Sequence, residues 1–517
     1  MKLLLRFIGV CLTVGLMSSH FGCTELEEEP LGQLVSENFF RTETDLETGL
    51  MGAYGRLLGR WSGGLFNASM CMVPCYGADD LTTGFFGNKE RLTQFDRFDA
   101  QSDNSWGATL YNGSYQVIND ANKVIDYAGQ VSGNPERIEN IVAQAHFLRG
   151  LAYLYLVRAY GNVPLITTTI GLDPNAVRRP ELVEVYDLIV ADFEQAEADL
   201  PTLQSDPGRP NQGAAQAYLA LTWLTRAGWP LNEGAASYAQ ARDYAKTVID
   251  GAGDYGFALL PNYADLWKRE NMNHTEGVFT IQLVHTNDGF GSFKWTKQGQ
   301  PNEEEGFEDY FTELTFFREF PEGPRKEATF YTVFKQATDE GLREIPWEES
   351  LRGHPFYAKF RDYGVDESAP STTSTQISAT LALMRYAEVL LIYAEAQAMA
   401  DGNPNAEAYQ AVNQIRRRAA SRELTLPDPA VDLPPGLSGE AFRDAVVAER
   451  GWEFAAEVGI RWYDLIRTEK VGEAMARRDP DELVPLVGDP NDRRKWWAPI
   501  PIGDTNKNPN LEQNPGY

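Results

Sequence analysis

The sequence predicts a mainly α-helical fold in which helices pair into hairpins, next to a less regular half with short strands. Apolar residues recur at the three/four spacing of amphipathic helices over most of residues 45–250, and again after residue 381. Between residues 255 and 375 this spacing disappears, and Gly-, Asn- and Ser/Thr-rich runs interrupt the chain. We therefore expect helices in both end regions and an irregular stretch between them.

The first helix is expected at residues 45–58, where apolar residues including Leu46, Leu50 and Leu57 share one face. Residues 59–105 are rich in Gly, Asn, Asp and aromatic residues without a lasting period, so we expect mostly loop there. The same periodicity places further helices at residues 106–128, 136–160, 180–200, 214–227, 238–249, 381–400, 406–420 and 442–454.

Glycine and proline mark the ends of these helices. Gly161 is a typical stop after residues 136–160. Pro180 suits the first position of the next helix, and Pro201 ends it. The apolar face expected between them is formed by Val183, Tyr186, Ile189, Val190, Phe193, Ala196 and Leu200.

Small residues at the expected helix contacts, such as Ala214, Ala217 and Ala394, resemble those of tetratricopeptide-type hairpins. A strict repeat of about 34 residues cannot be read, so the pattern alone predicts helical hairpins. Residues 278–284, VFTIQLV, have the composition of a strand. The irregular stretch should therefore contain some short strands.

The 517 residues allow a large core, and their formal net charge is −28. Nucleic-acid binding needs Lys and Arg to replace counterions, so this charge argues against it. The charge also argues against adhesion to an anionic membrane surface. A lipid would have to hold such a protein at a membrane.

The first residues are typical of a lipoprotein signal peptide. Lys2 and Arg6 precede a mostly apolar, uncharged run at residues 7–17, which is shorter than the roughly 20 residues of a membrane-spanning helix. Gly22 and Cys23 follow, so cleavage would leave Cys23 as a lipidated first residue. A plain secretory signal with an incidental cysteine is the second interpretation.

Processing would leave two further cysteines, Cys71 and Cys75, in the segment SMCMVPCYG. A disulfide is permitted in an exported protein, but the short spacing is awkward, and the sequence leaves the bridge open. Two Cys alone cannot make a metal site. Oxygen ligands for Ca²⁺ exist at Asp79-Asp80 and at residues 489–492, but neither has EF-hand spacing. We interpret both as solvated loops and expect no cofactor.

One string, VAERGWEFAAEVGIRWYDLIRTEK at residues 447–470, mixes charged and aromatic residues at helical spacing. The charges of Glu449, Arg450 and Arg461 stand too close to Trp452 and Trp462 for all of them to face water. A buried charge is tolerated only when it is paired. We therefore expect these charges to pair with one another.

Three further motifs accompany this string. They are AQAHFLRGLAYLYLVRAYGNVPL at residues 143–165, MRYAEVLLIYAEA at residues 384–396, and WAPIPIGDTNKNPNLEQNPGY at residues 497–517. All four, in this order, resemble motifs of the SusD/RagB family, the lipid-anchored nutrient-binding proteins of the Bacteroidetes cell surface. The resemblance covers about residues 23–517.

The resemblance implies four tetratricopeptide-like units in a right-handed superhelix that forms one lobe, against which the remainder packs. It divides the chain into a signal peptide (1–22), an acidic tether (23–35), an N-terminal region (36–260) and a C-terminal region (261–517). Within the last it implies irregular loops (285–375), helices (381–470) and the PIP…QNPGY tail. The run Glu27, Glu28 and Glu29 resembles a surface-export signal, although a solvated tether is the simpler interpretation.

Sequence motifs of catalysis are missing. The five histidines show no metal-binding spacing, and neither a G-x-S-x-G elbow nor a Walker A loop is present. Carboxylates are so abundant that any pair is a weak signal for a glycosidase. Glu388, Glu395, Glu449, Arg450 and Arg461 suggest acid/base chemistry, but they fall in scaffold motifs and are better explained as structural ion pairs. We expect no enzyme.

Binding fits the sequence better, because an aromatic face stacks on the apolar C–H surface of a sugar while polar neighbours bond its hydroxyls. The candidates are aromatic and polar residues of loops, although any single one is more often a hydrophobic plug. In order of preference they begin with Trp295, followed by Trp61, Tyr76, Asp80, Phe86, Phe293 and Trp347. Phe330, Tyr331 and Phe334 are expected to be scaffold.

The resemblance implies a function: an outer-membrane lipoprotein, facing the exterior, that captures an oligosaccharide or polysaccharide. Its implied partner is a SusC-like TonB-dependent transporter, over which it would act as a lid. One alternative is a RagB-like protein that binds peptides, which a groove rich in hydrogen-bonding partners and apolar pockets would favour. Another is a helical-repeat adaptor without a small ligand.

Overall fold

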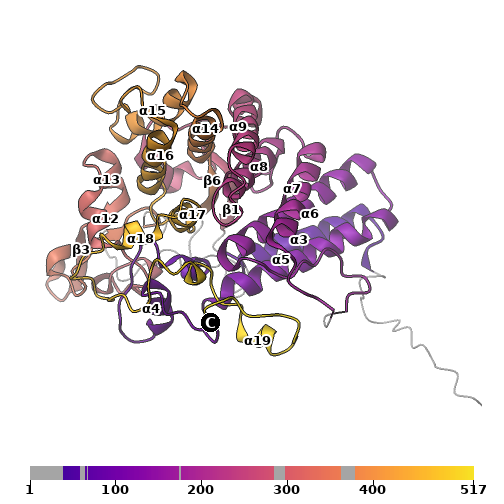
Figure 1. Ribbon diagram of the computed structural model, residues 1–517, viewed down its shortest axis with the longest axis horizontal. Helices are drawn as coiled ribbons and strands as arrows, with labels where there is room; N and C mark the ends of the chain where they lie inside the picture. The colour runs from indigo at the N-terminus through magenta and orange to yellow at the C-terminus, as the bar shows by residue number, and fades with distance from the viewer. Residues whose placement is uncertain (1–38, 59–63, 67, 174–175, 284–296, 362–378) are drawn as a thin grey trace, which may run out of the picture. The chain divides into compact units, whose positions relative to one another are not determined.

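The long helices pack in a row, each against the next (Figure 1). The computed structural model describes residues 39–58, 64–66, 68–173, 176–283, 297–361 and 379–517. The row consists of α3 (Glu43–Leu58), α5 (Ala108–Tyr127), α6 (Pro135–Tyr160), α7 (Leu182–Asp199), α8 (Gln212–Ala227), α9 (Ala235–Asp250), α14 (Tyr386–Asp401) and α16 (Gly439–Glu453), with α15 (Ala406–Ala419) beside α14. The predicted helical hairpins are confirmed.

Helix ends follow the sequence signals closely. The Asn134 side chain accepts a hydrogen bond from Arg137 N at 3.2 Å and so caps α6, and Gly161 ends that helix with φ 70°. Helix α7 begins at Leu182, because Glu181 and Glu184 form a capping box there. Pro180 therefore precedes the helix instead of opening it.

Two predictions about individual segments are wrong. Val183 is 39% exposed, so it does not belong to the buried face of α7. Residues 381–385 were predicted to begin a helix, but they lie in strand β6 (Ala379–Arg385), and α14 starts only at Tyr386. Strand β6 pairs antiparallel with β1 (Gly277–Leu283), which confirms the strand expected near residues 278–284.

Two smaller ribbons, β2 (Phe330–Tyr331) with β5 (Phe356–Tyr357) and β3 (Val333–Thr338) with β4 (Gly341–Pro346), make up the irregular part. Phe311, Phe334 and Phe356 form its aromatic core, with Tyr331 and Trp347 packed against it. The scaffold role expected for Phe334 is confirmed.

Short helices connect these elements. They are η2 (Ala68–Cys75), α4 (Glu90–Asp96), η3 (Ala128–Gln130), α10 (Ala252–Tyr255), η4 (Tyr263–Trp267), η5 (Arg269–Asn271), η6 (Asn302–Glu304), α12 (Leu314–Glu319), α13 (Pro324–Thr329), η7 (Trp347–Glu349), α17 (Ile460–Arg467), α18 (Val471–Met475), η9 (Arg493–Lys495) and α19 (Ile502–Thr505). Among the described helices, every one is too short or too polar to span a lipid bilayer.

Residues 497–517 are anchored on the end of α6. The Asn514 side-chain amide donates to the backbone carbonyls of Tyr160 at 2.9 Å and Ala498 at 2.7 Å. The Tyr517 hydroxyl donates to the carbonyl of Trp497 at 2.8 Å. The Asn-Pro-Gly-Tyr motif thus has a structural role.

The segment from η2 to Asp80 packs against the turn before α17. Cys71 and Cys75 are both buried and are not joined by a disulfide, so the bridge that the sequence left open is not formed. Gly459 adopts φ 76°, and a Cβ there would lie 2.5 Å from Cys75 Sγ. Only glycine fits this turn.

Candidate functional site

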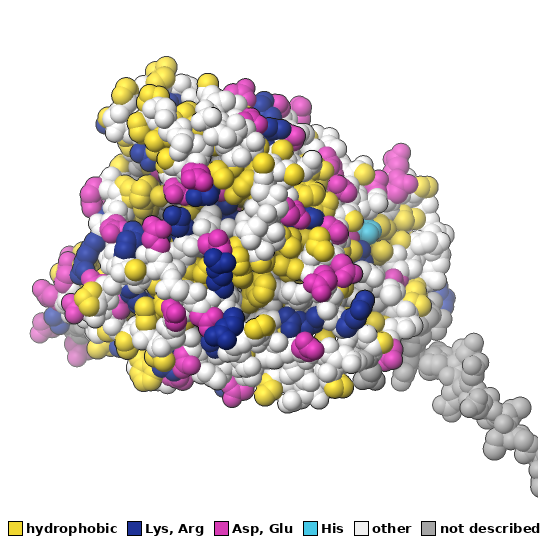
Figure 2. Space-filling view, viewed as in Figure 1, with side chains coloured by type: hydrophobic (Ala, Val, Ile, Leu, Met, Phe, Trp, Pro, Cys, Tyr) yellow, Lys and Arg dark blue, Asp and Glu magenta, His cyan; other side chains and the backbone are white. Residues whose placement is uncertain are grey.

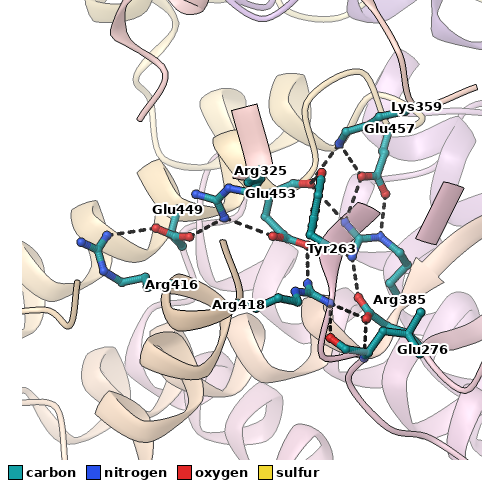
Figure 3. Close-up of polar contacts among 11 residues, drawn as sticks. Tyr263, Glu276, Arg325, Lys359, Arg385, Arg416, Arg418, Glu449, Glu453 and Glu457 are labelled. Carbon is teal, nitrogen blue, oxygen red and sulfur yellow. Dashed lines mark hydrogen bonds and ion pairs between the residues drawn. The ribbon is translucent and has the colours of Figure 1, made fainter. Parts of the chain in front are cut away.

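Three acidic residues of the string 447–470, Glu449, Glu453 and Glu457, form a buried ionic network with Arg and Lys side chains from elsewhere in the chain (Figure 3). Glu453 on α16 lies at its centre, with its carboxylate oxygens within 2.6 Å of Arg418, 2.8 Å of Arg385 and 3.1 Å of Arg325. Burial alone would raise the pKa of Glu453, but these three guanidinium groups lower it to about 2. Glu453 is therefore a permanently ionised structural group.

The other charges of the string are paired in the same way. Glu449 contacts Arg325 at 2.6 Å and Arg416 at 3.0 Å. Arg450 bridges Glu388 at 2.9 Å and Asp464 at 2.7 Å. The charges are paired, but most partners come from outside the string, so the prediction that they pair with one another is right for Arg450 and Asp464 and wrong for most of the others.

These ion pairs bear on whether the carboxylates of this region could act in acid/base catalysis. Arg467 holds both oxygens of Glu395, and Arg461 holds both oxygens of Asp79 at 2.6 and 2.7 Å. A carboxylate whose oxygens already accept hydrogen bonds from buried guanidinium groups has a structural role. The structural interpretation of Glu388, Glu395, Glu449, Arg450 and Arg461 therefore agrees with the geometry.

The candidate ligand residues divide into three groups. Trp61, Phe293 and Trp295 lie outside the described residues, as does the lipidation candidate Cys23, so these predictions stand untested. Tyr76 and Asp80 are buried within the fold. Phe86 and Trp347 are half-buried.

Tyr76 and Asp80 are wrong as ligand-stacking and ligand-bonding residues. The Tyr76 ring is fully buried and its hydroxyl donates to the carbonyl of Asp309 at 3.1 Å. Asp80 Oδ2 accepts from Ala456 N at 2.9 Å, and the Asp80 backbone carbonyl accepts from Tyr357. Burial raises the pKa of Asp80 to about 7. Asp79 and Asp80 are also not the solvated loop expected from the sequence.

Trp347 is mainly a packing residue. Its ring meets Phe317 edge-on at 5.7 Å between centroids, and it covers the aromatic core of the irregular part. Phe86 has a different environment, because the Arg352 guanidinium lies over its ring at 3.3 Å from the centroid.

Large exposed apolar residues stand next to Phe86, Glu308 and Arg352 in the sequence. Phe85 is 61% exposed, Phe307 44% and Leu351 63%, unusual values for such large apolar side chains. We call these three residues, together with Phe86 and Arg352, the aromatic surface.

Hydrogen bonds and ion pairs fix this surface. Arg352 is held by Glu308 at 2.7 Å, and Leu351 N donates to Glu303 Oε1 at 2.7 Å. The aromatic surface therefore joins three segments that are far apart in sequence, near residues 85, 305 and 351.

The described residues that flank the strongest sequence candidate can be related to this surface. Phe307 N donates to the carbonyl of Lys297, the first described residue after 284–296, at 2.7 Å. At the other end, Leu283, the last described residue before 284, pairs with Ala379. The aromatic surface is thus bonded to the residue that follows segment 284–296, and Trp295 belongs to that segment in the sequence.

The aromatic surface has the chemistry of a sugar-binding face. Two phenyl rings offer apolar planes, while Arg352 donates hydrogen bonds and Glu303 and Glu308 accept them. Phe86 was visible in the sequence as a loop aromatic. Arg352 was missed, since nothing near it in the sequence shows that it contacts Phe86 and Glu308.

Apart from the aromatic surface, a hollow lies along α5. It is a groove of about 610 Å³ with an aliphatic wall that includes Ile166, Leu172 and Leu511. Asn112, Gln116 and Asn119 also line it, and they stand one helical turn apart on one face of α5. Aliphatic walls with a few polar groups are typical of ligand grooves.

Metal binding finds no support in the described part of the chain, where His, Cys, Asp and Glu form no cluster of three or more suited to a metal ion.

Two family models match the chain. One, described as the SusD family, matches residues 266–517, and the other, described as starch-binding associating with outer membrane, matches residues 78–224. Together they cover well over half of the 517 residues. The chain belongs to the SusD family. A relative that matches over the full length of the chain supports this assignment.

SusD-like protein P2 from Formosa agariphila is 27% identical over 537 aligned residues, which cover 100% of both chains. A SusD homologue from Bacteroides thetaiotaomicron has the same fold, with TM-score 0.76 and 22% identity over 93% of this chain and 98% of that one. A structure solved with xylogluco-oligosaccharide matches with TM-score 0.72 and 21% identity, over 89% of this chain and 97% of that one. The SusD-like helical fold predicted from the sequence is confirmed.

Proposed function

We propose that this SusD-family protein is a cell-surface glycan-binding lipoprotein that captures an oligosaccharide and passes it to a SusC-like TonB-dependent transporter. The observation that carries the binding step is the aromatic surface, where Arg352 lies over the Phe86 ring and binds Glu308, and where exposed Phe85 and Phe307 adjoin Phe86 and Glu308 in the sequence. Exposed aromatic patches rimmed by polar groups mark binding sites. The family description as starch-binding and a related structure solved with xylogluco-oligosaccharide support a glycan as ligand.

Trp295 is the residue that we expect to complete this site, followed by Trp61 and Phe293. Trp295 lies two residues before Lys297, whose carbonyl binds Phe307 N at 2.7 Å. A larger indole ring near two phenyl rings would extend the apolar platform along the glycan.

The anchor and the partner belong to the same proposal. A lipid on Cys23 and the acidic residues after it would hold the protein on the outer membrane while leaving it free to swing as a lid. The description of one matching family as associating with the outer membrane supports this location. The binding role, without catalysis, agrees with the ion-paired carboxylates of the string 447–470.

Affinity electrophoresis of residues 24–517 through gels that contain a panel of polysaccharides tests the binding step. We expect one glycan to retard the protein, and the double variant Phe85→Ala/Phe307→Ala to migrate as it does in a gel without glycan. Trp295→Ala should also lose retardation. Leu426→Ala, which truncates an apolar side chain that is 64% exposed elsewhere, is the matched control and should behave as wild type.

Retardation that survives both aromatic variants would contradict the assigned site while keeping the function. Free migration of the wild type through every gel would contradict glycan binding itself.

The α5 groove supports a second candidate function, the capture of peptides. Its row of amides could bond a peptide backbone, and its aliphatic wall could receive side chains. Calorimetry with a peptide mixture tests this candidate. Heat that Asn112→Ala/Gln116→Ala abolishes would favour it over a glycan.

A further inference from the structure

A polar groove lies between α12, α16, α17 and α18, separate from the aromatic surface. It comprises two hollows of about 170 and 250 Å³, and Arg461 and Arg477 line both of them. The smaller hollow is also lined by Trp452, Thr315, Glu319 and Arg478. We call this feature the Trp452 groove, and Figure 2 shows basic and acidic side chains interspersed over the face where α16, α17 and α18 lie.

The two arginines that line both hollows differ in how far their side chains are exposed. Arg461 is buried and held by both oxygens of Asp79. Arg477 is 48% exposed and pairs with Glu319 at 2.6 Å. This exposed pair presents guanidinium donors and carboxylate acceptors side by side, as the hydroxyls of a sugar require.

Arg478 adds a donor that the fold does not use. Its side chain is only 5% exposed, and Nη1 contacts Asp96 at 2.7 Å. Among the described residues, its Nε has no acceptor. Arg478 thus keeps one buried N–H without an acceptor in the described part of the chain, next to the groove that its residue lines.

The indole of Trp452 supplies the apolar part of the site. It lies half-buried near the end of α16. A Trp beside charged hydrogen-bonding groups can stack on a pyranose ring while those groups bond its hydroxyls.

The balance of acidic and basic residues in the smaller hollow indicates whether a charged or an uncharged ligand fits it. Its three guanidinium groups, from Arg461, Arg477 and Arg478, face three acidic residues, Asp79, Glu313 and Glu319. Neither sign dominates, so the lining favours an uncharged, hydroxyl-rich ligand over a carboxylate or a phosphate.

We propose that the Trp452 groove is a second binding site of this protein, and that it takes a neutral sugar ring stacked on Trp452. The inference extends the proposed glycan function to a site that shares no residue with the aromatic surface. Two sites on one protein raise the affinity for a long chain, because binding at the second becomes intramolecular once the first is occupied.

The test uses ¹⁹F NMR of residues 24–517 labelled with 5-fluorotryptophan. The variants Trp452→Phe and Trp295→Phe assign the two signals by their loss, and the unchanged remaining signals show that each variant folds. The probes are neutral hexoses and pentoses, glucuronate as the charged comparison, and a xylogluco-oligosaccharide.

We expect the Trp452 signal to shift saturably with a neutral sugar and to stay in place with glucuronate. Arg477→Met should weaken that affinity about tenfold, the value of one charge-assisted hydrogen bond. A Trp452 signal that moves with none of the sugars, or only with glucuronate, would overturn the proposal. The Trp295 signal and the gel assay report on the aromatic surface independently, so failure of the groove and failure of the proposed function give different results.

Discussion

Arg385, the last residue of β6, donates to Glu453 near the end of α16 at 2.8 Å, and both side chains are buried. The same guanidinium reaches Glu457 at 2.9 Å and Glu276 at 2.6 Å. One arginine thus connects the β1–β6 ribbon to the string 447–470. The network holds the helical row and the irregular part together at this point.

Glu453→Gln should destabilise the fold by about 3–5 kcal/mol, because three buried guanidinium groups lose their shared counter-charge. Urea unfolding at pH 7, followed by far-UV circular dichroism, measures the change in the free energy of unfolding. Glu440→Gln is the control, since Glu440 is exposed on the same helix, and it should cost less than about 1 kcal/mol. Equal losses in the two variants would contradict the central role of Glu453.

The same residue contributes to acid unfolding. The guanidinium groups lower the pKa of Glu453 from its ordinary 4.5 to about 2. A lowered folded-state pKa gives stability that is present above the unfolded pKa and is lost as the pH falls toward the folded one. The wild type should therefore lose stability between about pH 4.5 and pH 2, and Glu453→Gln should show a smaller loss over that range. A parallel pH profile for the two proteins would refute this assignment.

Asp80 should act in the opposite direction. Burial raises its pKa from 3.8 to about 7, so the folded state holds a proton that the unfolded chain releases. Its protonated form stabilises the fold below about pH 4, and that stability is lost as the pH rises to about 7.

Asp80→Asn keeps an acceptor for Ala456 N without the charge. Its stability relative to wild type should therefore rise between pH 5 and pH 8, as measured by urea unfolding at each pH. If the difference between the two proteins does not change with pH, Asp80 is ionised in the fold throughout.

Cys71 and Cys75 should be unreactive in the folded protein. Both are buried, and burial raises the pKa of Cys75 to about 12. The thiolate is the reactive form, so Ellman's reagent should detect almost no thiol in residues 24–517 at pH 8 and two thiols in urea. Fast reaction of the native protein, or no thiol in urea, would contradict two buried cysteines without a disulfide.

Cys23→Ser should release the protein from membranes. Lipidation needs the thiol, and the described residues contain no helix that could cross a bilayer. Fractionation of cells that express the full chain measures the share in the membrane pellet, and palmitate labelling should disappear in the variant. Membrane retention of the unlabelled variant would show that another contact anchors it.

Long amphipathic helices were predictable, because local periodicity records which face is buried. Strand β6 was not, since residues 381–400 form a nearly continuous apolar run, and periodicity cannot separate a buried strand from a buried helix there.

The site was harder to predict than the fold. Tyr76 and Asp80 lie in a segment whose composition is typical of an exposed loop. They are nevertheless buried, because their partners Asp309, Tyr357 and Ala456 lie more than 230 positions away in the sequence. Arg352 became a candidate only through its contact with the Phe86 ring, which is also far away in the sequence. Sequence reasoning identified the residue types of the site better than their positions.

The Asn514 side chain that binds the Tyr160 carbonyl is 354 residues from it along the chain. Helix α6 therefore leaves the ribosome long before the residue that secures its end exists. Contacts of such separation form slowly, because the loop between them must close first. The first helices can form early during synthesis, but they reach their final arrangement only when the most recently made residues return to them.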